Sequence, residues 1–141
     1  MQSSEEVKID TNLYSRQIGT FGMETMGKLI QMNVLIVGLR GLGVETAKNL
    51  ILAGPHSVTL YDPVQVSWGD LSSNFYLKEE HVGTTTRADA CVDRLQELNS
   101  NVRVKRIDHL TQLDLANYTV VCITEIFENI DKMIEDNEFC R

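Results

Sequence analysis

Two patterns of apolar and polar residues alternate along the chain. A short continuous apolar run at 33–37 is typical of a strand buried on both faces of a sheet, and further strands are expected at 57–61, at 102–107, where basic residues alternate with apolar ones, and at 118–123. Segments with apolar residues at helical spacing lie at 42–53, 86–98 and 125–140, and another at 13–32 is interrupted near 19–22. Segment 65–77 is expected to be a loop. This order predicts an α/β fold, with a doubly wound, mainly parallel sheet of about four strands, helices on both faces and right-handed crossovers.

Composition and charge exclude several function classes. The 141 residues are 43% apolar and 23% charged, which is ordinary for one globular domain. A net charge of −7 argues against nucleic acid as a partner, since phosphates need a basic face. No run approaches the ~18 apolar residues of a membrane span, so no membrane partner is expected. The three cysteines form no Cys-x-x-Cys pair, and the three histidines have no metal-ligand spacing, so we expect no metal site.

The most informative motif follows the first predicted strand. Residues 38–43 read Gly-Leu-Arg-Gly-Leu-Gly, close to the Gly-x-Gly-x-x-Gly fingerprint that joins a strand to a helix in Rossmann-like nucleotide-binding folds. Gly38 and Gly43 fit the fingerprint. Arg40 stands at the middle glycine, where the backbone must approach a phosphate. Asp62 ends the second predicted strand, where such folds place a ribose-binding acid.

These residues alone leave two interpretations open. In the first, Gly38, Gly41 and Gly43 only permit the tight turn, and Arg40 is an exposed or interface arginine. In the second, the turn binds a nucleotide, as in an NAD(P)-dependent oxidoreductase or another nucleotide-binding regulatory domain. Arg40 would then hold a phosphate or a partner carboxylate.

Four further segments carry a resemblance to a known family: 14–17 (Tyr-Ser-Arg-Gln), 41–49, 70–76 and 94–99. Together they resemble the eukaryotic ubiquitin-activating enzymes, in particular the N-terminal part of their inactive adenylation half, which has a ThiF/MoeB-like fold. The resemblance implies a flexible N-terminus at 1–12 and, at 13–141, the first part of that half, truncated at its C-terminal end. A related half occurs in the activating enzymes of sister ubiquitin-like modifiers, which remain an alternative.

The resemblance implies that the nucleotide site of this half is degenerate. The active half has a glycine, an aspartate and an arginine where this chain has Arg40, Val64 and Ser73. Thr84, Thr86 and Ala88 fall in the stretch where a lysine and an aspartate for phosphates and Mg²⁺ are expected. A valine and neutral hydroxyls do not compensate a buried triphosphate, so no cofactor is expected here. The degenerate site comprises Gly38, Arg40, Gly41, Gly43, Asp62, Val64 and Ser73.

The same resemblance identifies Arg16 as the residue nearest the chemistry. In the family, the matching arginine crosses a pseudo-dimer interface to the ATP phosphates bound by the active half. A guanidinium suits this role because it carries a permanent charge and five fixed donors. Without the resemblance, Arg16 is more simply a cation on a helix surface, paired with a nearby acid.

The resemblance also implies what the whole enzyme does. With ATP and Mg²⁺ it would adenylate the ubiquitin C-terminus, form a thioester on a cysteine of a later domain, and pass ubiquitin to conjugating enzymes in the cytoplasm and nucleus. The fragment alone is expected to be inactive and to self-associate through its open sheet edge. We expect Cys91 to lie in the core, Trp68 and Phe75 to cover the pocket or form an interface, and the acids from Glu125 onward to form a solvated helix face.

Overall fold

The computed structural model describes residues 8–141, so most of the segment predicted to be flexible lies outside the described residues. In chain order the helices and strands are α1 (Ser15–Phe21), α2 (Met23–Leu29), β1 (Asn33–Val37), α3 (Gly41–Ala53), β2 (Ser57–Tyr61), α4 (Arg87–Gln96), β3 (Arg103–Arg106), β4 (Val120–Ile123) and α5 (Ile130–Phe139). Short 3₁₀ helices are η1 (Trp68–Ser72), η2 (Glu79–His81) and η3 (Gln112–Asn117). No helix within 8–141 is long and apolar enough to cross a membrane.

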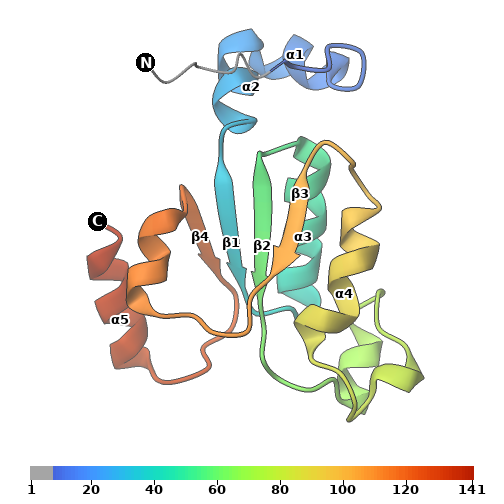
Figure 1. Cartoon of the computed structure of the whole chain (residues 1–141), viewed down its shortest axis with the longest axis vertical. Coiled ribbons are helices and arrows are strands. Elements are labelled where there is room, and N and C mark those ends of the chain that lie inside the picture. Colours follow the sequence, from blue (N-terminus) through green and yellow to red (C-terminus); the bar gives the residue numbers. More distant parts are fainter. Residues whose placement is uncertain (1–7) are drawn as a thin grey trace.

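The strands form one parallel sheet in the order β3-β2-β1-β4, which confirms the predicted fold class (Figure 1). The strands predicted at 33–37 and 57–61 are β1 and β2, with the predicted bounds. Because all four strands run the same way, their carboxyl ends meet at one edge. The turn at 38–43 and the segments that follow β2 and β4 therefore converge there.

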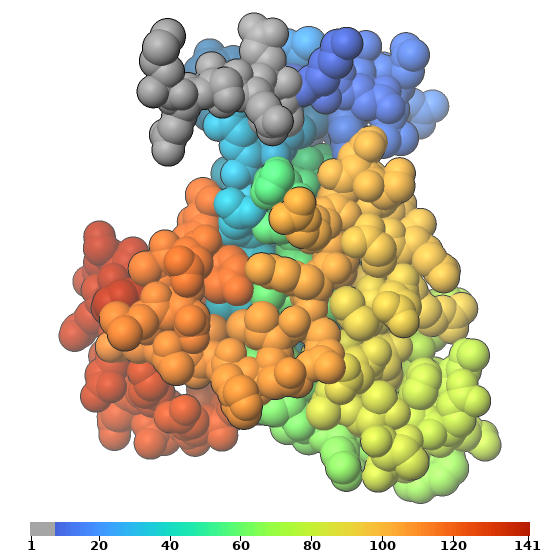
Figure 2. Space-filling view, in the orientation of Figure 1, coloured from blue at the N-terminus to red at the C-terminus, as the bar shows by residue number. Residues whose placement is uncertain are grey.

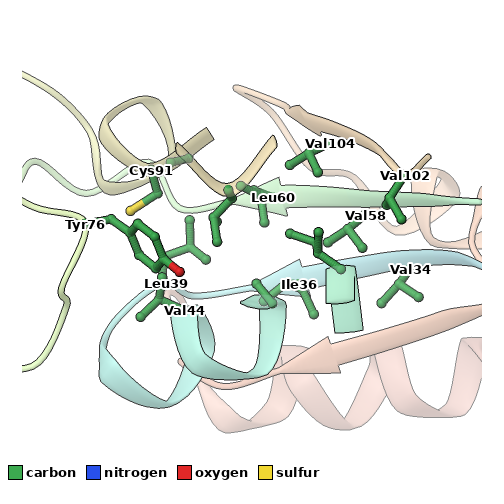
Figure 3. Close-up of a cluster of buried hydrophobic side chains, with 14 of the residues drawn as sticks. Val34, Ile36, Leu39, Val44, Val58, Leu60, Tyr76, Cys91, Val102 and Val104 are labelled. Atoms are coloured by element: carbon green, nitrogen blue, oxygen red, sulfur yellow. The ribbon is translucent and has the colours of Figure 1, made fainter. Parts of the chain in front are cut away.

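Apolar side chains bury both faces of the central strands. On one face, β1 and β2 contribute Val34, Ile36, Val58 and Leu60 to a core completed by α3 and α4 (Figure 3). On the other face, Leu35 and Val37 pack against Leu115 of η3. Helix α5 packs against η3, beside the β4 edge (Figure 1). Successive side chains of β1 point to opposite faces of the sheet, and both faces are buried, so residues 34–37 are all apolar.

Two helical patterns have different outcomes. The first is split at Gly22, within the predicted interruption, and the φ of +81° there favours glycine. The last helix begins at Ile130 rather than at Glu125, because the Asn129 side chain accepts a hydrogen bond from the Lys132 amide (2.8 Å) and caps it. The prediction that Glu125 lies on a solvated helix face is therefore wrong: it lies in the loop after β4.

Helices α1 and α2 form a small lobe beyond the amino ends of the strands, at the opposite end from the glycine turn (Figures 1 and 2). Tyr14, Met26 and Ile30 form its buried cluster. Arg16 therefore lies at one end of the sheet, and the residues of the degenerate site lie at the other.

Gly43→Ala is predicted to destabilise the chain by about 1–3 kcal/mol. A Cβ at Gly43 would lie 2.7 Å from both the carbonyl carbon of Gly38 and Oγ1 of Thr124, so the strand-to-helix turn must shift. Gly27→Ala is the matched control, since its Cβ meets nothing within 4 Å inside α2, and it should stabilise by about 0.5–1 kcal/mol. Urea unfolding of both variants measures the difference, and equal midpoints would contradict the close approach.

Candidate functional site

The fingerprint glycines are required by the approach of the loop that follows β4. Gly38 has φ +95°, and a Cβ there would lie 2.6 Å from Cβ of Glu125. The Thr124 hydroxyl lies 3.0 Å from both the Val37 and the Gly38 carbonyl oxygens. Gly38 and Gly43 therefore have a packing role in this turn whether or not a nucleotide binds.

Asp62, the candidate ribose acid, is fully buried and bonded to backbone. One oxygen accepts from the Leu39 amide in the glycine turn (2.8 Å), and the other accepts from the Val64 amide (3.1 Å). The carboxylate thus ties the end of β2 to the turn after β1. Both carboxylate oxygens therefore already accept hydrogen bonds from the chain itself.

A buried arginine lies beside Asp62, and the sequence analysis had not singled it out. The Arg87 side chain is only 2% exposed. Its Nε lies 3.0 Å from Asp70, and its Nη1 lies 3.4 Å from Asp62 and 3.2 Å from Glu125. Glu125 also pairs with Nε of Arg40 (3.0 Å), whose side chain is 63% exposed. We call these five residues, Arg40, Asp62, Asp70, Arg87 and Glu125, the Arg87 cluster.

Local structure fixes the position of Asp70 in the cluster. Asp70 accepts from the amide and hydroxyl of Ser67 (2.9 Å each), which caps η1. Burial raises the pKa of Asp70, but hydrogen bonds from Arg87 and Ser67 outweigh that effect and hold the pKa below its usual value. Burial lowers the pKa of Arg87, and the hydrogen bond to Asp70 with the charges of Asp62 and Glu125 more than restores it. The buried pair is therefore charged across the physiological range.

The remaining predicted site residues surround the cluster. Ser73 backs the first turn of α3, since a Cβ on Gly41 would lie 3.0 Å from the Ser73 Cβ. The Val64 carbonyl accepts from the Arg87 amide (2.9 Å). Thr86 caps α4 by accepting from the Asp89 amide (3.1 Å). The structure thus brings Gly38, Arg40, Gly41, Gly43, Asp62, Val64 and Ser73 to one edge of the sheet.

The buried thiol near the cluster is not a nucleophile. Cys91 lies in the core as predicted, and burial raises its pKa to about 11. Its nearest polar neighbour is Asn74, whose side chain also donates to the Leu39 carbonyl (2.9 Å). Trp68 and Phe75 are largely exposed. A thiol this hard to deprotonate does not attack an acyl group at neutral pH.

A periodic signal could have identified Arg87. It lies four residues before Cys91 and eight before Leu95, on the buried face of α4. A charged residue in register with an apolar stripe indicates a buried ion pair, because an unpaired buried charge is very costly. Its partners were not evident, since Asp62, Asp70 and Glu125 lie 17–38 residues away in the chain.

Arg16 is exposed on α1, remote from the Arg87 cluster (Figure 1). Within residues 8–141 its guanidinium forms no ion pair, so the pairing with a nearby acid that we considered does not occur in this part of the chain.

The comparisons with known proteins agree with one another. The ThiF family matches residues 14–135. The ubiquitin-activating enzyme E1 1 of Triticum aestivum is 49% identical over 134 residues, which are 94% of this chain and 12% of the wheat protein. The ubiquitin-like modifier-activating enzyme 1 of Oryctolagus cuniculus is 44% identical over 140 residues, which are 99% of this chain and 13% of the rabbit protein. The crystal structure of Escherichia coli tRNA N6-threonylcarbamoyladenosine dehydratase, TcdA, in complex with ATP has a TM-score of 0.69 and 20% identity, covering 82% of this chain and 49% of TcdA.

The parallel sheet with a glycine turn after its first strand defines a Rossmann-like α/β domain, the fold that TcdA shares. The chain belongs to the ThiF family. It spans 12–13% of the length of the two curated relatives named above, both of them activating enzymes by name.

The charged side chains beside the turn are paired with one another. Three carboxylates and two guanidinium groups form the Arg87 cluster, which therefore carries a formal net charge of −1. The buried Arg87 donors are already directed at carboxylates of the same chain. No group of three or more histidine, cysteine or acidic side chains that could hold a metal occurs in the described part of the chain.

Arg87→Ala is predicted to destabilise the chain by about 3–5 kcal/mol, because it leaves Asp62 and Asp70 buried beside each other without a counter-charge. Arg94→Ala is the matched control, since this arginine is exposed on the same helix and its loss should change stability by less than about 0.5 kcal/mol. Guanidinium chloride unfolding measures both. A loss below about 1 kcal/mol for Arg87→Ala would refute the structural role of the cluster.

Proposed function

We propose that this chain is the first part of the inactive adenylation half of a ubiquitin-activating enzyme. The observation that carries the proposal is the Arg87 cluster, in which a buried guanidinium of the chain itself pairs with Asp62 and the other carboxylates beside the glycine turn. Identity of 44–49% to activating enzymes over nearly the whole chain supports the assignment to that class. In the complete enzyme, this half scaffolds the active half rather than binding its own ATP.

In this proposal the contribution to chemistry comes from Arg16. The active half binds ATP and Mg²⁺, adenylates the ubiquitin C-terminus and leads to a thioester for transfer to conjugating enzymes. Arg16 reaches across to the phosphates of that ATP, where a fixed positive charge stabilises the charge that develops on them. The exposed guanidinium, without an ion pair in residues 8–141, supports this role.

Two alternatives have less support. A dinucleotide-dependent oxidoreductase explains the glycine turn and Asp62, but Asp62 is bonded to backbone amides and to Arg87 instead of being open to a ribose. An activating enzyme for a sister modifier has the same fold, and the degenerate site favours neither modifier. Transfer assays with purified modifiers on the complete enzyme distinguish the two.

The isolated chain is predicted to bind neither Mg-ATP nor NADH. Calorimetric titration with Mg-ATP should show no saturable heat, because the cluster already pairs its cations and carries net negative charge. Escherichia coli TcdA, whose structure contains ATP, is the positive control. Micromolar affinity would contradict the degenerate site, and an NADH fluorescence change on titration would favour the oxidoreductase.

Arg16→Ala in the complete enzyme is predicted to slow ubiquitin-dependent ATP–pyrophosphate exchange by about 10²-fold, the typical effect of removing one preorganised charge donor. Lys28→Ala is the matched control, since Lys28 is an exposed cation on the neighbouring helix and pairs with Glu24 (2.9 Å). Exchange at the wild-type rate in Arg16→Ala would show that Arg16 has no part in adenylation.

A further inference from the structure

Two motifs far apart in the sequence meet at the base of the α1–α2 lobe. The Asn99 side chain donates to the Tyr14 hydroxyl (2.9 Å) and to the Ile51 carbonyl at the end of α3 (2.9 Å). Tyr14 is 4% exposed and Asn99 is 8% exposed, so this bridge is shielded from water. Tyr14 begins the segment 14–17 that contains Arg16, and Asn99 ends the segment 94–99.

The backbone beneath Tyr14 is shaped to receive its ring. Gly54 closes α3 in the left-handed region at φ +92°. A Cβ on Gly54 would lie 2.5 Å from Cζ of Tyr14, so glycine is needed at this position for the ring as well as for the helix end. Gln17 lies one helical turn after Tyr14, and its side-chain amide is directed at the Leu52 and Ala53 carbonyls (3.5 Å each).

Helix α1 depends on tertiary contacts for its orientation, and besides Tyr14 and Gln17 these include Ile18, which packs against Met26 and Ile30. The helix has seven residues, it lacks a side-chain N-cap hydrogen bond, and none of its own residues is buried. Helices this short are marginal in water, so contacts to the rest of the chain must set where α1 lies. Tyr14 and Gln17 face the C-terminal end of α3, while Arg16 is exposed to solvent.

We propose that Tyr14, which is bonded to Asn99 and packed on Gly54, is a positioning residue that orients Arg16. The inference rests on the proposed function of Arg16 and adds how the guanidinium is held in place. An arginine that acts across an interface must be fixed closely, because a displacement of about 1 Å costs on the order of 10²-fold in rate. The Tyr14–Asn99 bridge fixes α1 against the α3–α4 layer, which belongs to the rigid sheet core.

The test uses Tyr14→Phe in the complete enzyme, which keeps the ring and removes only the hydroxyl. We expect ATP–pyrophosphate exchange to fall about three- to tenfold through kcat or the KM for ATP, with the KM for ubiquitin unchanged. Asn99→Ala removes the other partner and should have a similar effect. Tyr118→Phe is the matched control, because this half-buried tyrosine packs on the opposite face of the sheet, and it should leave exchange unchanged.

A double variant separates positioning from general stability. If Tyr14 acts through Arg16, then Tyr14→Phe should have no further effect on exchange in an Arg16→Ala background. A further fall of the same size there, or normal exchange in Tyr14→Phe alone, overturns the positioning role while the proposed function of Arg16 stands. Normal exchange in Arg16→Ala overturns the proposed function, and the positioning inference with it.

Discussion

The buried guanidinium of Arg87 holds the carboxyl edge of the sheet together. Its partners come from the end of β2, from η1 and from the loop after β4, while Arg87 itself begins α4. A buried charge is tolerated only with close counter-charges and satisfied hydrogen bonds, so these four segments have one mutual arrangement. The glycine turn joins the same arrangement through Asp62, which accepts from the Leu39 amide. One cation thereby fixes the geometry of a site that a nucleotide would otherwise help to order.

The fold and the ligand site respond to different constraints at this turn. Gly38 and Gly43 remain because the loop at Thr124 and Glu125 packs directly on them, a requirement of strand-to-helix packing. Arg40 at the middle position has an exposed side chain that pairs with Glu125, so it does not disturb the packing of the turn. A chain can therefore keep the outline of a phosphate-binding turn while its polar groups are satisfied internally.

Local pattern predicted the elements, and long-range pairing decided the site. The segments 33–37 and 57–61 were predicted to be strands and became the central strands β1 and β2, since a strand buried on both faces is mainly apolar. The acids and apolar residues from Glu125 onward resembled a helix, but the capping interaction of Asn129 starts α5 later and frees Glu125 to reach Arg40 and Arg87. The contact between Tyr14 and Asn99 joins residues 85 positions apart, and no periodicity connects them.

The two ends of the sheet are well separated, which agrees with the proposal that Arg16 acts at a site other than the glycine turn of its own half. A five-residue parallel strand is about 16 Å long, which exceeds the reach of an arginine side chain. Arg16 lies beyond the amino ends of the strands, whereas the Arg87 cluster lies at their carboxyl ends (Figure 1). Closing the carboxyl edge with internal ion pairs therefore has no direct effect on the guanidinium of Arg16. In the proposed enzyme, a half without its own nucleotide site would still present a firmly held arginine, provided that Tyr14 keeps the short helix α1 fixed to the sheet core.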